Sequence, residues 1–149
     1  MSIETVDVKI KKLDPNALIP AYGTEFSAGA DLHACLEEPL EIAAGRSVVI
    51  HTGIAVELPE GYAGFVFARS GLASRQGLAP SNKVGVIDSD YRGEIMVSLF
   101  NHSDSTACIS PGDRIAQMVV MPYVKACWIN SEALQDTERG TGGFGSTGH

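Results

Sequence analysis

Hydrophobic and polar residues alternate along most of the chain with the two-residue period that is typical of half-buried β-strands. In residues 6–13, for example, Val6, Val8 and Ile10 alternate with charged neighbours, which predicts a strand with one face on a core. Further runs rich in β-branched and aromatic residues predict strands over residues 30–36, 47–58, 62–69, 82–87, 94–101, 114–121 and 123–129. Turn-forming residues separate these runs from one another.

Only one segment has helical character. Residues 70–77, with the sequence SGLASRQG, predict a short helix with Ser70 as its N-cap and Gly77 as its stop. Many short strands at regular spacing predict an all-β sandwich or jelly roll. A length of 149 residues without an internal repeat or an interdomain linker fits a single domain.

The predicted strand over residues 114–121 is apolar on both of its faces. A strand of an antiparallel sheet with one wet face should alternate instead. Two explanations are open: a neighbouring copy of the chain covers the second face, or the strand is central in a sandwich and lies under a loop. In either case Gln117 within this run needs a hydrogen-bond partner, because an unpaired buried amide is costly.

Composition and charge narrow the class of function. Apolar residues make up 44% of the chain and charged residues 19%, which excludes disorder for most of it. A net charge of −7 argues against nucleic acids and anionic membranes as partners, although a few arginines can still bind a small anion. No apolar run has transmembrane length and no signal peptide is recognisable, so we expect a cytoplasmic protein. In that setting Cys35, Cys108 and Cys127 are expected to be buried, reduced thiols.

Residues 84–97, VGVIDSDYRGEIMV, are the first candidate for chemistry. Two apolar runs flank a polar tip, which predicts a β-hairpin with Asp88 at the end of its first strand and Tyr91 at its tip. Gly85 weakens that strand unless a group approaches its backbone closely, and Asn82 adds a side-chain amide nearby. The alternative is structural, because Asp is a common turn former and Tyr often caps a hairpin. Metal-ligand spacings, a nucleophile elbow and a phosphate-binding P-loop are all missing from the sequence.

Two further stretches are candidate anion sites. In ARSGLA, residues 68–73, Arg69 and Ser70 precede free N–H groups of the predicted helix. The alternative is a helix cap beside a surface arginine. The C-terminal RGTGGFGSTGH, residues 139–149, carries Arg139 and Phe144 on a glycine-rich tether. This tether is either a disordered tail or a flap that closes over an anion.

Taken together and in order, five stretches resemble the motifs of the trimeric dUTPase family. They are AGADLHA at residues 28–34, ARSGLA at 68–73, NKVGVIDSDYRGEI at 82–95, PGDRIAQ at 111–117 and RGTGGFGSTG at 139–148. The resemblance implies a jelly roll or distorted β-barrel that assembles as a homotrimer, with active sites at the subunit contacts. It further implies a core over residues 1–137 and a flexible flap over residues 138–149 that closes over nucleotide.

The resemblance also implies a role for individual residues. Asp88 would activate the attacking water, Tyr91 would stack on the deoxyribose, and Met96 would line the same pocket. The uracil edge would be read by Asn82, Gly85, Val86 and Ile87. The phosphates would be bound by Arg69, Ser70, Gly71 and Gln117, together with Arg139, Gly145, Ser146 and Thr147 of the flap, whose Phe144 would stack on uracil. Asp31 would belong to a water network near the metal, whereas Arg114 is left as a structural residue.

The activity implied by this family is hydrolysis of dUTP to dUMP and pyrophosphate, which limits uracil in DNA and supplies dUMP for dTMP synthesis. Mg²⁺ would be held by the triphosphate and by waters, without direct protein ligands. Three alternatives remain: a homologous dCTP deaminase, for which Glu94 is a candidate acid–base residue; a nucleotide-responsive binding module; and a monomeric β-sandwich with a frayed tail.

Overall fold

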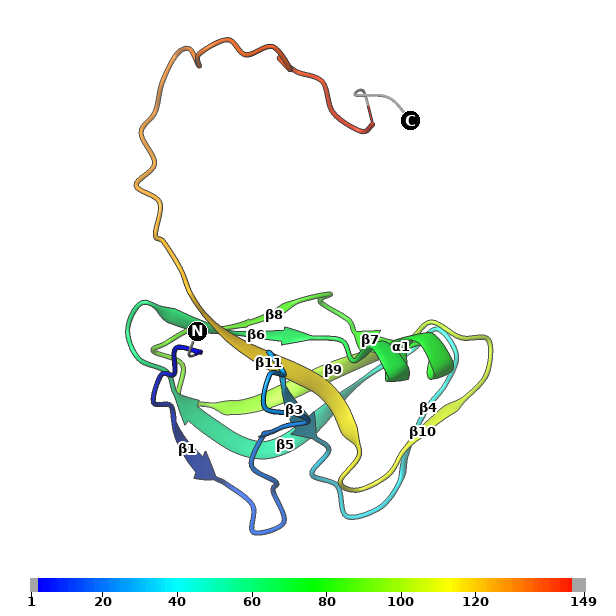
Figure 1. The fold of residues 1–149 in the computed structure, drawn as a ribbon. Coiled ribbons are helices and arrows are strands. Elements are labelled where there is room, and N and C mark those ends of the chain that lie inside the picture. The colour runs from blue at the N-terminus through cyan, green and yellow to red at the C-terminus, as the bar shows by residue number, and fades with distance from the viewer. Residues whose placement is uncertain (1–2, 146–149) are drawn as a thin grey trace.

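The computed structural model describes residues 3–145, which fold into two facing antiparallel sheets and a small third sheet (Figure 1). One sheet has the order β1 (Lys9–Lys12), β5 (Ser47–Glu57), β9 (Glu94–Asn101) and β7 (Leu78–Pro80). The other has the order β2 (Ala21–Tyr22), β3 (Ala30–His33), β11 (Arg114–Pro122), β6 (Tyr62–Phe67) and β8 (Gly85–Ile87). Strands β4 (Leu40–Ile42) and β10 (Ala107–Ile109) pair separately.

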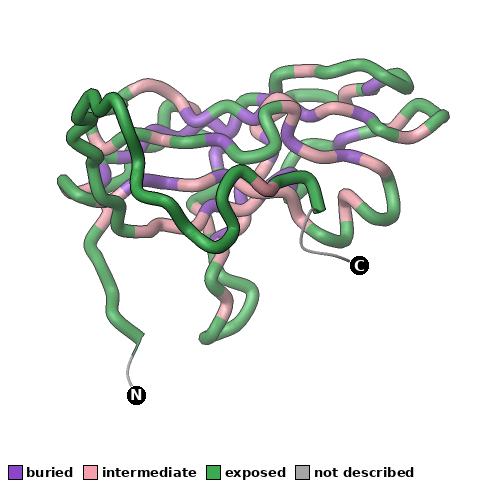
Figure 2. Tube along the Cα trace, turned by 90° about the horizontal axis from the view of Figure 1, so that it is seen from above, coloured by how far each residue is buried: buried purple, intermediate pink, exposed green. Residues whose placement is uncertain are grey.

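The hydrophobic core lies between the two larger sheets. Alternate residues of β9, namely Ile95, Val97 and Leu99, are buried, and they face a layer that includes Leu32 and Ile115 of the other sheet. Figure 2 shows buried residues throughout the body and almost none in the C-terminal arm. The all-β jelly-roll class predicted from strand periodicity is therefore confirmed. Within the described residues, no helix is long and apolar enough to cross a membrane.

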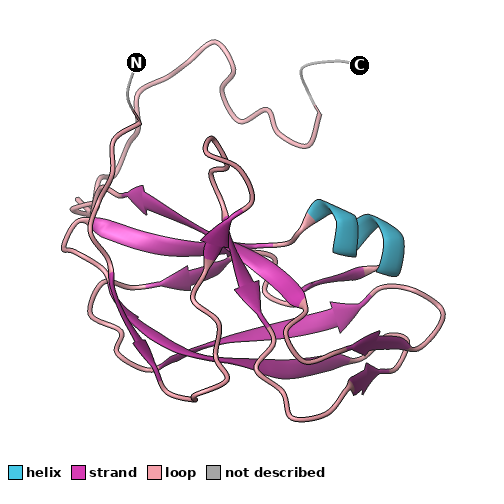
Figure 3. Ribbon diagram, turned by 60° about the horizontal axis from the view of Figure 1, so that its bottom comes forward, coloured by secondary structure: helices cyan, strands magenta, loops and turns pink. Residues whose placement is uncertain are grey.

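The predicted helix is confirmed as α1 (Ser70–Gln76), which lies at one end of the sandwich (Figure 3). Gly77 ends it in the left-handed conformation, with φ 67°, and its N–H returns to the carbonyl of Ala73. The predicted N-cap is wrong by one residue. Arg69 has the extended backbone of a cap and makes no side-chain capping bond, whereas Ser70 is already helical.

The predicted β-hairpin over residues 84–97 is wrong. Strand β8 pairs with β6 in one sheet, while β9 pairs with β5 and β7 in the other. Because β9 is hydrogen-bonded along both of its edges, it has no edge left for β8. Residues 88–93 therefore cross from one sheet to the other.

The first and last predicted strands also differ from expectation. All four residues of β1 are exposed, because it is an edge strand that pairs only with β5, and only the preceding Val8 packs against the core. Residues 123–129 form no strand. After Pro122 the chain leaves the body as an arm, on which Trp128 is 91% exposed and Ile129 86% exposed. The apolar residues of segment 123–129 indicate that it is buried, but the sequence pattern does not show whether the same chain or another copy buries it.

The thiols are less buried than expected. Cys35 is partly buried, whereas Cys108 on β10 and Cys127 on the arm are exposed, and all three are free. Burial raises the pKa of the Cys35 thiol, and the neighbouring Asp14 carboxylate raises that pKa further.

An apolar row crosses the outer face of the five-stranded sheet. The pairing register aligns Val119 of β11 with Phe65 of β6, and Phe65 with Val86 of β8. Val119 and Phe65 are half-buried and Val86 is 57% exposed. No described segment of the same chain covers this row fully, which agrees with the doubly apolar pattern of residues 114–121.

Candidate active site

A small cleft lies where the chain crosses between the sheets. It has a volume of 180 Å³ and is lined by Val86, Ile87, Asp88, Tyr91, Glu94 and Met96. Such a volume equals that of about six waters, which is room for one planar ring. Five of these six residues belong to the site predicted from the sequence. The structure thus brings them together at the end of β8 and the start of β9, although β8 and β9 belong to different sheets.

The crossing loop is held by hydrogen bonds at the mouth of this cleft. The Tyr91 hydroxyl donates to the Glu94 carbonyl over 2.8 Å, and the Tyr91 N–H donates to the Asp88 carbonyl over 3.1 Å. Gly93 lies directly beside the Tyr91 ring, and a β-carbon at that position would collide with it. The loop therefore holds the Tyr91 ring in one place.

Gly85 is explained by packing within the chain itself. A β-carbon on Gly85 would lie 3.2 Å from the Val66 Cβ and 3.3 Å from the Asn82 Nδ2. Both distances are tighter than ordinary contacts, so the glycine lets β8 approach β6 and the Asn82 amide. Gly85 is buried, while the predicted uracil-reading residue Asn82 is exposed.

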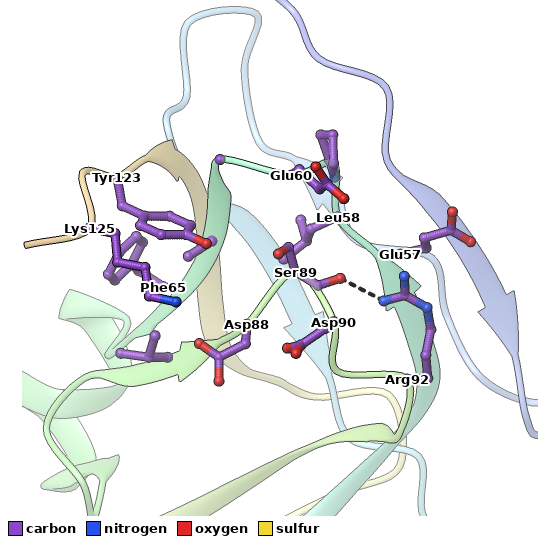
Figure 4. Close-up of a pocket in the computed structure, with 14 residues that line it drawn as sticks. Glu57, Leu58, Glu60, Phe65, Asp88, Ser89, Asp90, Arg92, Tyr123 and Lys125 are labelled. Carbon is purple, nitrogen blue, oxygen red and sulfur yellow. Dashed lines mark hydrogen bonds between the residues drawn. The ribbon is translucent and has the colours of Figure 1, made fainter.

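Asp88 also borders a larger groove of 1040 Å³ (Figure 4). Glu57, Glu60 and Asp90 add three further carboxylates to this groove, and Arg92 and Lys125 contribute its cations. The Asp88 side chain is exposed, and within residues 3–145 its carboxylate accepts no hydrogen bond. It is therefore free to accept a proton, but the surrounding negative charge would repel a polyphosphate unless further cations are brought to the groove.

The predicted phosphate residues meet in a separate cleft of 480 Å³ at the start of α1. Its lining includes Asp31, Arg69, Ser70, Gly71, Arg114 and Gln117. The Nε of Arg69 donates to Asp31 Oδ1 over 2.7 Å, which leaves both terminal guanidinium nitrogens of Arg69 for an anion. Arg114 donates to Asp31 Oδ2 over 3.5 Å, in keeping with the structural role expected for it.

His33 lies on the same outer face as this ion-paired group. Burial lowers the pKa of the His33 imidazole, and the charges of Arg114 and Arg69 act in the same direction. The Asp31 carboxylate opposes that shift without reversing it. The His33 ring is therefore held toward its neutral form, and the positive charge of the cleft comes from the two arginines.

Gln117 has the hydrogen-bond partner that its position required. Its Nε2 donates to the Ala68 carbonyl over 2.9 Å, and its second amide hydrogen is left for a ligand. The Gln117 amide lies over Gly29, where a β-carbon would collide with it. Gly29 is thus a residue that the sequence reasoning missed, since a glycine in a strand-leading loop has many other uses.

The two clefts lie apart on one chain and have no lining residue in common. Ile87 pairs with Gly64, and β6 then runs away from Asp88 toward Arg69. The five residues from Gly64 to Arg69 correspond to roughly 16 Å of extended chain. A single chain therefore separates its candidate base from its candidate anion site.

The predicted flap residues lie on the arm, away from the body (Figure 1). Phe144 is fully exposed, and the Arg139 Nε donates to the carbonyl of Gly142 over 2.9 Å. Gly145 has a positive φ of 85°, which its lack of a side chain permits. Ser146 and Thr147 lie outside the described residues.

Glu94 and His51 form a contact that no sequence signal indicated. The His51 Nδ1 lies 2.8 Å from Glu94 Oε2, and the Gly53 N–H donates to Glu94 Oε1 over 2.8 Å. These residues lie on different strands, β5 and β9, so only the pairing register brings them together.

The structure offers no ready-made cage for a metal ion. Among residues 3–145 there is no group of three or more His, Cys, Asp or Glu side chains placed to hold one. Both Asp31 oxygens accept from arginines but retain lone pairs for bound water. These donors fit a hard cation that is carried by the oxygens of its ligand and by water.

Comparison with known proteins relates the whole chain to one family. The family model named dUTPase matches residues 15–148. Deoxyuridine 5'-triphosphate nucleotidohydrolase of Maricaulis maris is 47% identical over 98% of this chain and 99% of its own length. The protein of the same name from Desulfitobacterium hafniense is 49% identical, with the same coverage. The solved G164S mutant of the Staphylococcus bacteriophage 80alpha dUTPase with dUpNHpp superimposes with a TM-score of 0.88 at 28% identity, covering 97% of this chain and all of that one.

Proposed function

This chain belongs to the dUTPase family and is a dUTP diphosphatase, and from that premise we propose how its residues hydrolyse dUTP to dUMP and pyrophosphate. We propose that Asp88 accepts a proton from a water that attacks the α-phosphorus. The observation that carries this assignment is the position of Asp88, whose unpaired carboxylate lies on the border between the small cleft and the large groove. A nucleotide whose base lies in the cleft can thus extend its phosphates past Asp88.

The small cleft binds the nucleoside in this proposal. Backbone groups of Gly85, Val86 and Ile87, together with Asn82, read the uracil edge. Tyr91 packs against the deoxyribose, where a ribose 2′-hydroxyl would collide with its ring, and Met96 closes the far wall. Cytosine reverses the donor and acceptor pattern at that edge and would leave buried groups unpaired, which a hydrogen-bonding site rejects strongly.

The triphosphate is bound by the second cleft. Arg69, oriented through its Nε by Asp31, offers its two terminal nitrogens to one phosphate. Ser70 and Gly71 add groups at the start of α1, and Gln117 adds its remaining amide hydrogen. These groups lie far from Asp88 of the same chain. In the proposal they therefore bind the phosphates of a nucleotide that reacts at Asp88 of another copy.

A homotrimer with shared sites accounts for several features of the single chain. It would cover the apolar row formed by Val119, Phe65 and Val86, and it would bring arginines to the carboxylate-rich groove. It would also shelter the exposed arm residues Trp128 and Ile129, so that residues 1–137 act as a core. Closed symmetric assemblies of this kind are the common form of soluble oligomers.

Residues 138–149 act as a flap over the bound nucleotide. In the single chain the described part of this segment is largely exposed, and its hydrogen bonds stay within the arm, to Thr137 and to Gly142. In the proposal Phe144 stacks on uracil and Arg139 pairs with the γ-phosphate, while Gly145, Ser146 and Thr147 donate to phosphate oxygens. Closure excludes water other than the attacking molecule.

Mg²⁺ fits the donors that the chain provides, with the triphosphate and waters as its ligands and Asp31 as acceptor from a bound water. When bound, it would neutralise charge on the phosphates. In the hydrolysis itself, an oxygen–phosphorus bond forms at the α-phosphorus while the bond to the bridging oxygen breaks. The proton of the water passes to Asp88 and pyrophosphate leaves.

We place this reaction in the cytoplasm, where three free thiols stay reduced, and we assign it to limiting uracil in DNA and supplying dUMP for dTMP synthesis. The deaminase alternative needs a free acid–base glutamate. Both Glu94 oxygens are engaged, by the Gly53 N–H and by His51, which supports hydrolysis instead.

The substitution Asp88→Asn tests the assigned base. We expect turnover of dUTP to fall by about 10²–10⁴-fold, because the amide cannot accept the proton, while binding of a non-hydrolysable dUTP analogue persists. Pyrophosphate release from dUTP, dCTP, dTTP and UTP with Mg²⁺ measures the first effect, and calorimetry measures the second.

The matched control is Asp104→Asn, an exposed residue of the turn before β10, which should keep wild-type turnover. Equal loss of turnover and of analogue binding in Asp88→Asn would make Asp88 a structural residue. Release of ammonia from dCTP by the wild-type enzyme would show that the protein is a deaminase, which would contradict the proposed hydrolysis.

A further inference from the structure

We propose that Glu94 is a positioning residue that, together with His51 and Gly53, holds Tyr91 in place and so sets the discrimination between deoxyribose and ribose nucleotides. This inference rests on the proposed function, in which Tyr91 packs against the sugar.

The first part of the argument is the way Tyr91 is held. Its hydroxyl donates to the backbone carbonyl of Glu94 over 2.8 Å, and its ring lies over Gly93, where no β-carbon intervenes. Tyr91 is nevertheless 40% exposed and lies outside any strand. The position of its ring therefore depends on the position of the Glu94 backbone.

The second part is that the pairing of β5 with β9 is irregular on one side of Glu94. Strand β5 pairs His51 with Met96 in regular register, but the next recorded pair is Ala55 with Glu94, so the register shifts between the two. Gly53 lies in this irregular stretch of β5 and has a φ of 68°, a left-handed conformation that accompanies the shift in register. The start of β9 thus lacks the even hydrogen bonding of its later residues.

The Glu94 side chain bridges that irregular stretch. Its Oε1 accepts from the Gly53 N–H and its Oε2 is 2.8 Å from the His51 Nδ1. The Glu94 side chain is only 22% exposed, so these charge-assisted bonds are partly shielded from water. One carboxylate thereby ties β5 to the residue whose carbonyl holds Tyr91.

The bonds form a continuous connection from β5 to the sugar side of the cleft. They run from His51 and Gly53 to the Glu94 carboxylate, then through the Glu94 carbonyl to the Tyr91 hydroxyl. If the Tyr91 ring excludes a 2′-hydroxyl by steric contact, it must stay in place, because a small displacement would make room for ribose. Loosening the Glu94 carboxylate should therefore affect the choice of sugar more than the rate of hydrolysis.

The substitution Glu94→Ala tests this directly in the full-length enzyme. We expect the ratio of kcat/KM for dUTP to kcat/KM for UTP to fall roughly tenfold to a hundredfold, the scale on which misplaced positioning groups act. The KM for UTP should fall by a larger factor than kcat for dUTP, since the proposed base Asp88 is untouched. Glu41→Ala, which removes an exposed glutamate from β4, is the matched control and should leave the ratio unchanged.

Two further variants separate positioning from folding. His51→Ala removes only one anchor, from a side chain that is 59% exposed, and should lower the ratio severalfold without loss of folding. Glu94→Gln keeps an acceptor for the Gly53 N–H and a polar partner for His51, so it should restore most of the discrimination. Equal losses in Glu94→Gln and Glu94→Ala would mean that the charge acts in another way, and would overturn the proposal.

A double-mutant cycle with Tyr91→Phe identifies the route of the effect. Removing the Tyr91 hydroxyl cuts the connection, so Glu94→Ala should change the ratio little in that background. Additive losses, or wild-type ratios in both Glu94→Ala and His51→Ala, would overturn the inference while leaving the proposed function intact. If the wild-type enzyme itself failed to prefer dUTP over UTP, the proposed function would fail first.

Discussion

Asp31 is the residue that joins two arginines in the cleft at the start of α1. A single carboxylate receives the Nε of Arg69 and the Nη1 of Arg114, with 15% of its side chain exposed. Because Asp31 holds Arg69 through its Nε, both terminal nitrogens of the guanidinium stay available to a ligand. The resemblance of residues 28–34 to a family motif indicated Asp31, and the structure supplies the arginines that it contacts.

Gly29→Ala is a test at the same scale. The added β-carbon would collide with the Gln117 amide, so the side chain of Gln117 must swing away from the cleft. We expect the KM for dUTP to rise roughly tenfold with little change in melting temperature, because one charge-assisted bond to phosphate is lost. Steady-state kinetics and thermal unfolding measure the two effects.

Gln117→Ala provides the control for that test. That change removes the Oε1 and Cδ atoms with which the added β-carbon would collide most closely and leaves only the Gln117 Cβ, at 3.1 Å. Gly29→Ala should therefore add little to Gln117→Ala. A further tenfold loss in the double variant would show that Gly29 acts on the cleft by another route.

Among the elements, strands β8 and β9 show the limit of reasoning from local sequence. Residues 84–97 have the sequence of a hairpin, yet β8 and β9 pair in different sheets. The predicted grouping of residues is still correct, because the crossing loop brings Asp88 and Tyr91 beside Met96. The residues of the site follow from the sequence, whereas the element that carries them does not.

Deleting residues 139–149 tests the C-terminal arm as an element. Its described residues bury nothing against the body, so the melting temperature should change by no more than about 2 °C. We expect kcat/KM for dUTP to fall by about 10²-fold or more, because closure over the nucleotide is lost. A fall of several degrees in melting temperature would instead show that the segment is structural, and Phe144→Ala should give a smaller loss of activity in the same direction.

At the scale of the whole molecule, the proposed active site needs groups from two clefts that lie apart on one chain. One chain places Asp88 roughly 16 Å or more along the sheet from Arg69. In its acidic groove the carboxylates outnumber the two cations, Arg92 and Lys125. Both difficulties disappear if each site takes Asp88 from one chain and Arg69 from another. Such an assembly would also cover Trp128 and Ile129 of the arm, which are exposed in the single chain.

Mixing two inactive variants tests this arrangement. Asp88→Asn and Arg69→Ala should each be nearly inactive alone. After they are unfolded and refolded together in equal amounts, about a quarter of the sites should recover both groups from independently drawn chains. Pyrophosphate release measures the recovery, and sedimentation reports the oligomeric state. Persistent inactivity of the mixture, with mixed oligomers present, would place both groups in the same chain.

The sequence by itself determined the all-β class, a short helix after Arg69 and the main polar residues of both clefts, including Asp88, Arg69 and Gln117. Alternation, turn residues and motif order are local properties, and they report which side chains are buried or polar. Only the tertiary structure decided that β8 and β9 belong to different sheets, that Asp88 and Arg69 lie apart, and that Glu94 meets His51. Strand pairing joins segments that are far apart in the chain, and no local pattern of polarity specifies which edges will meet.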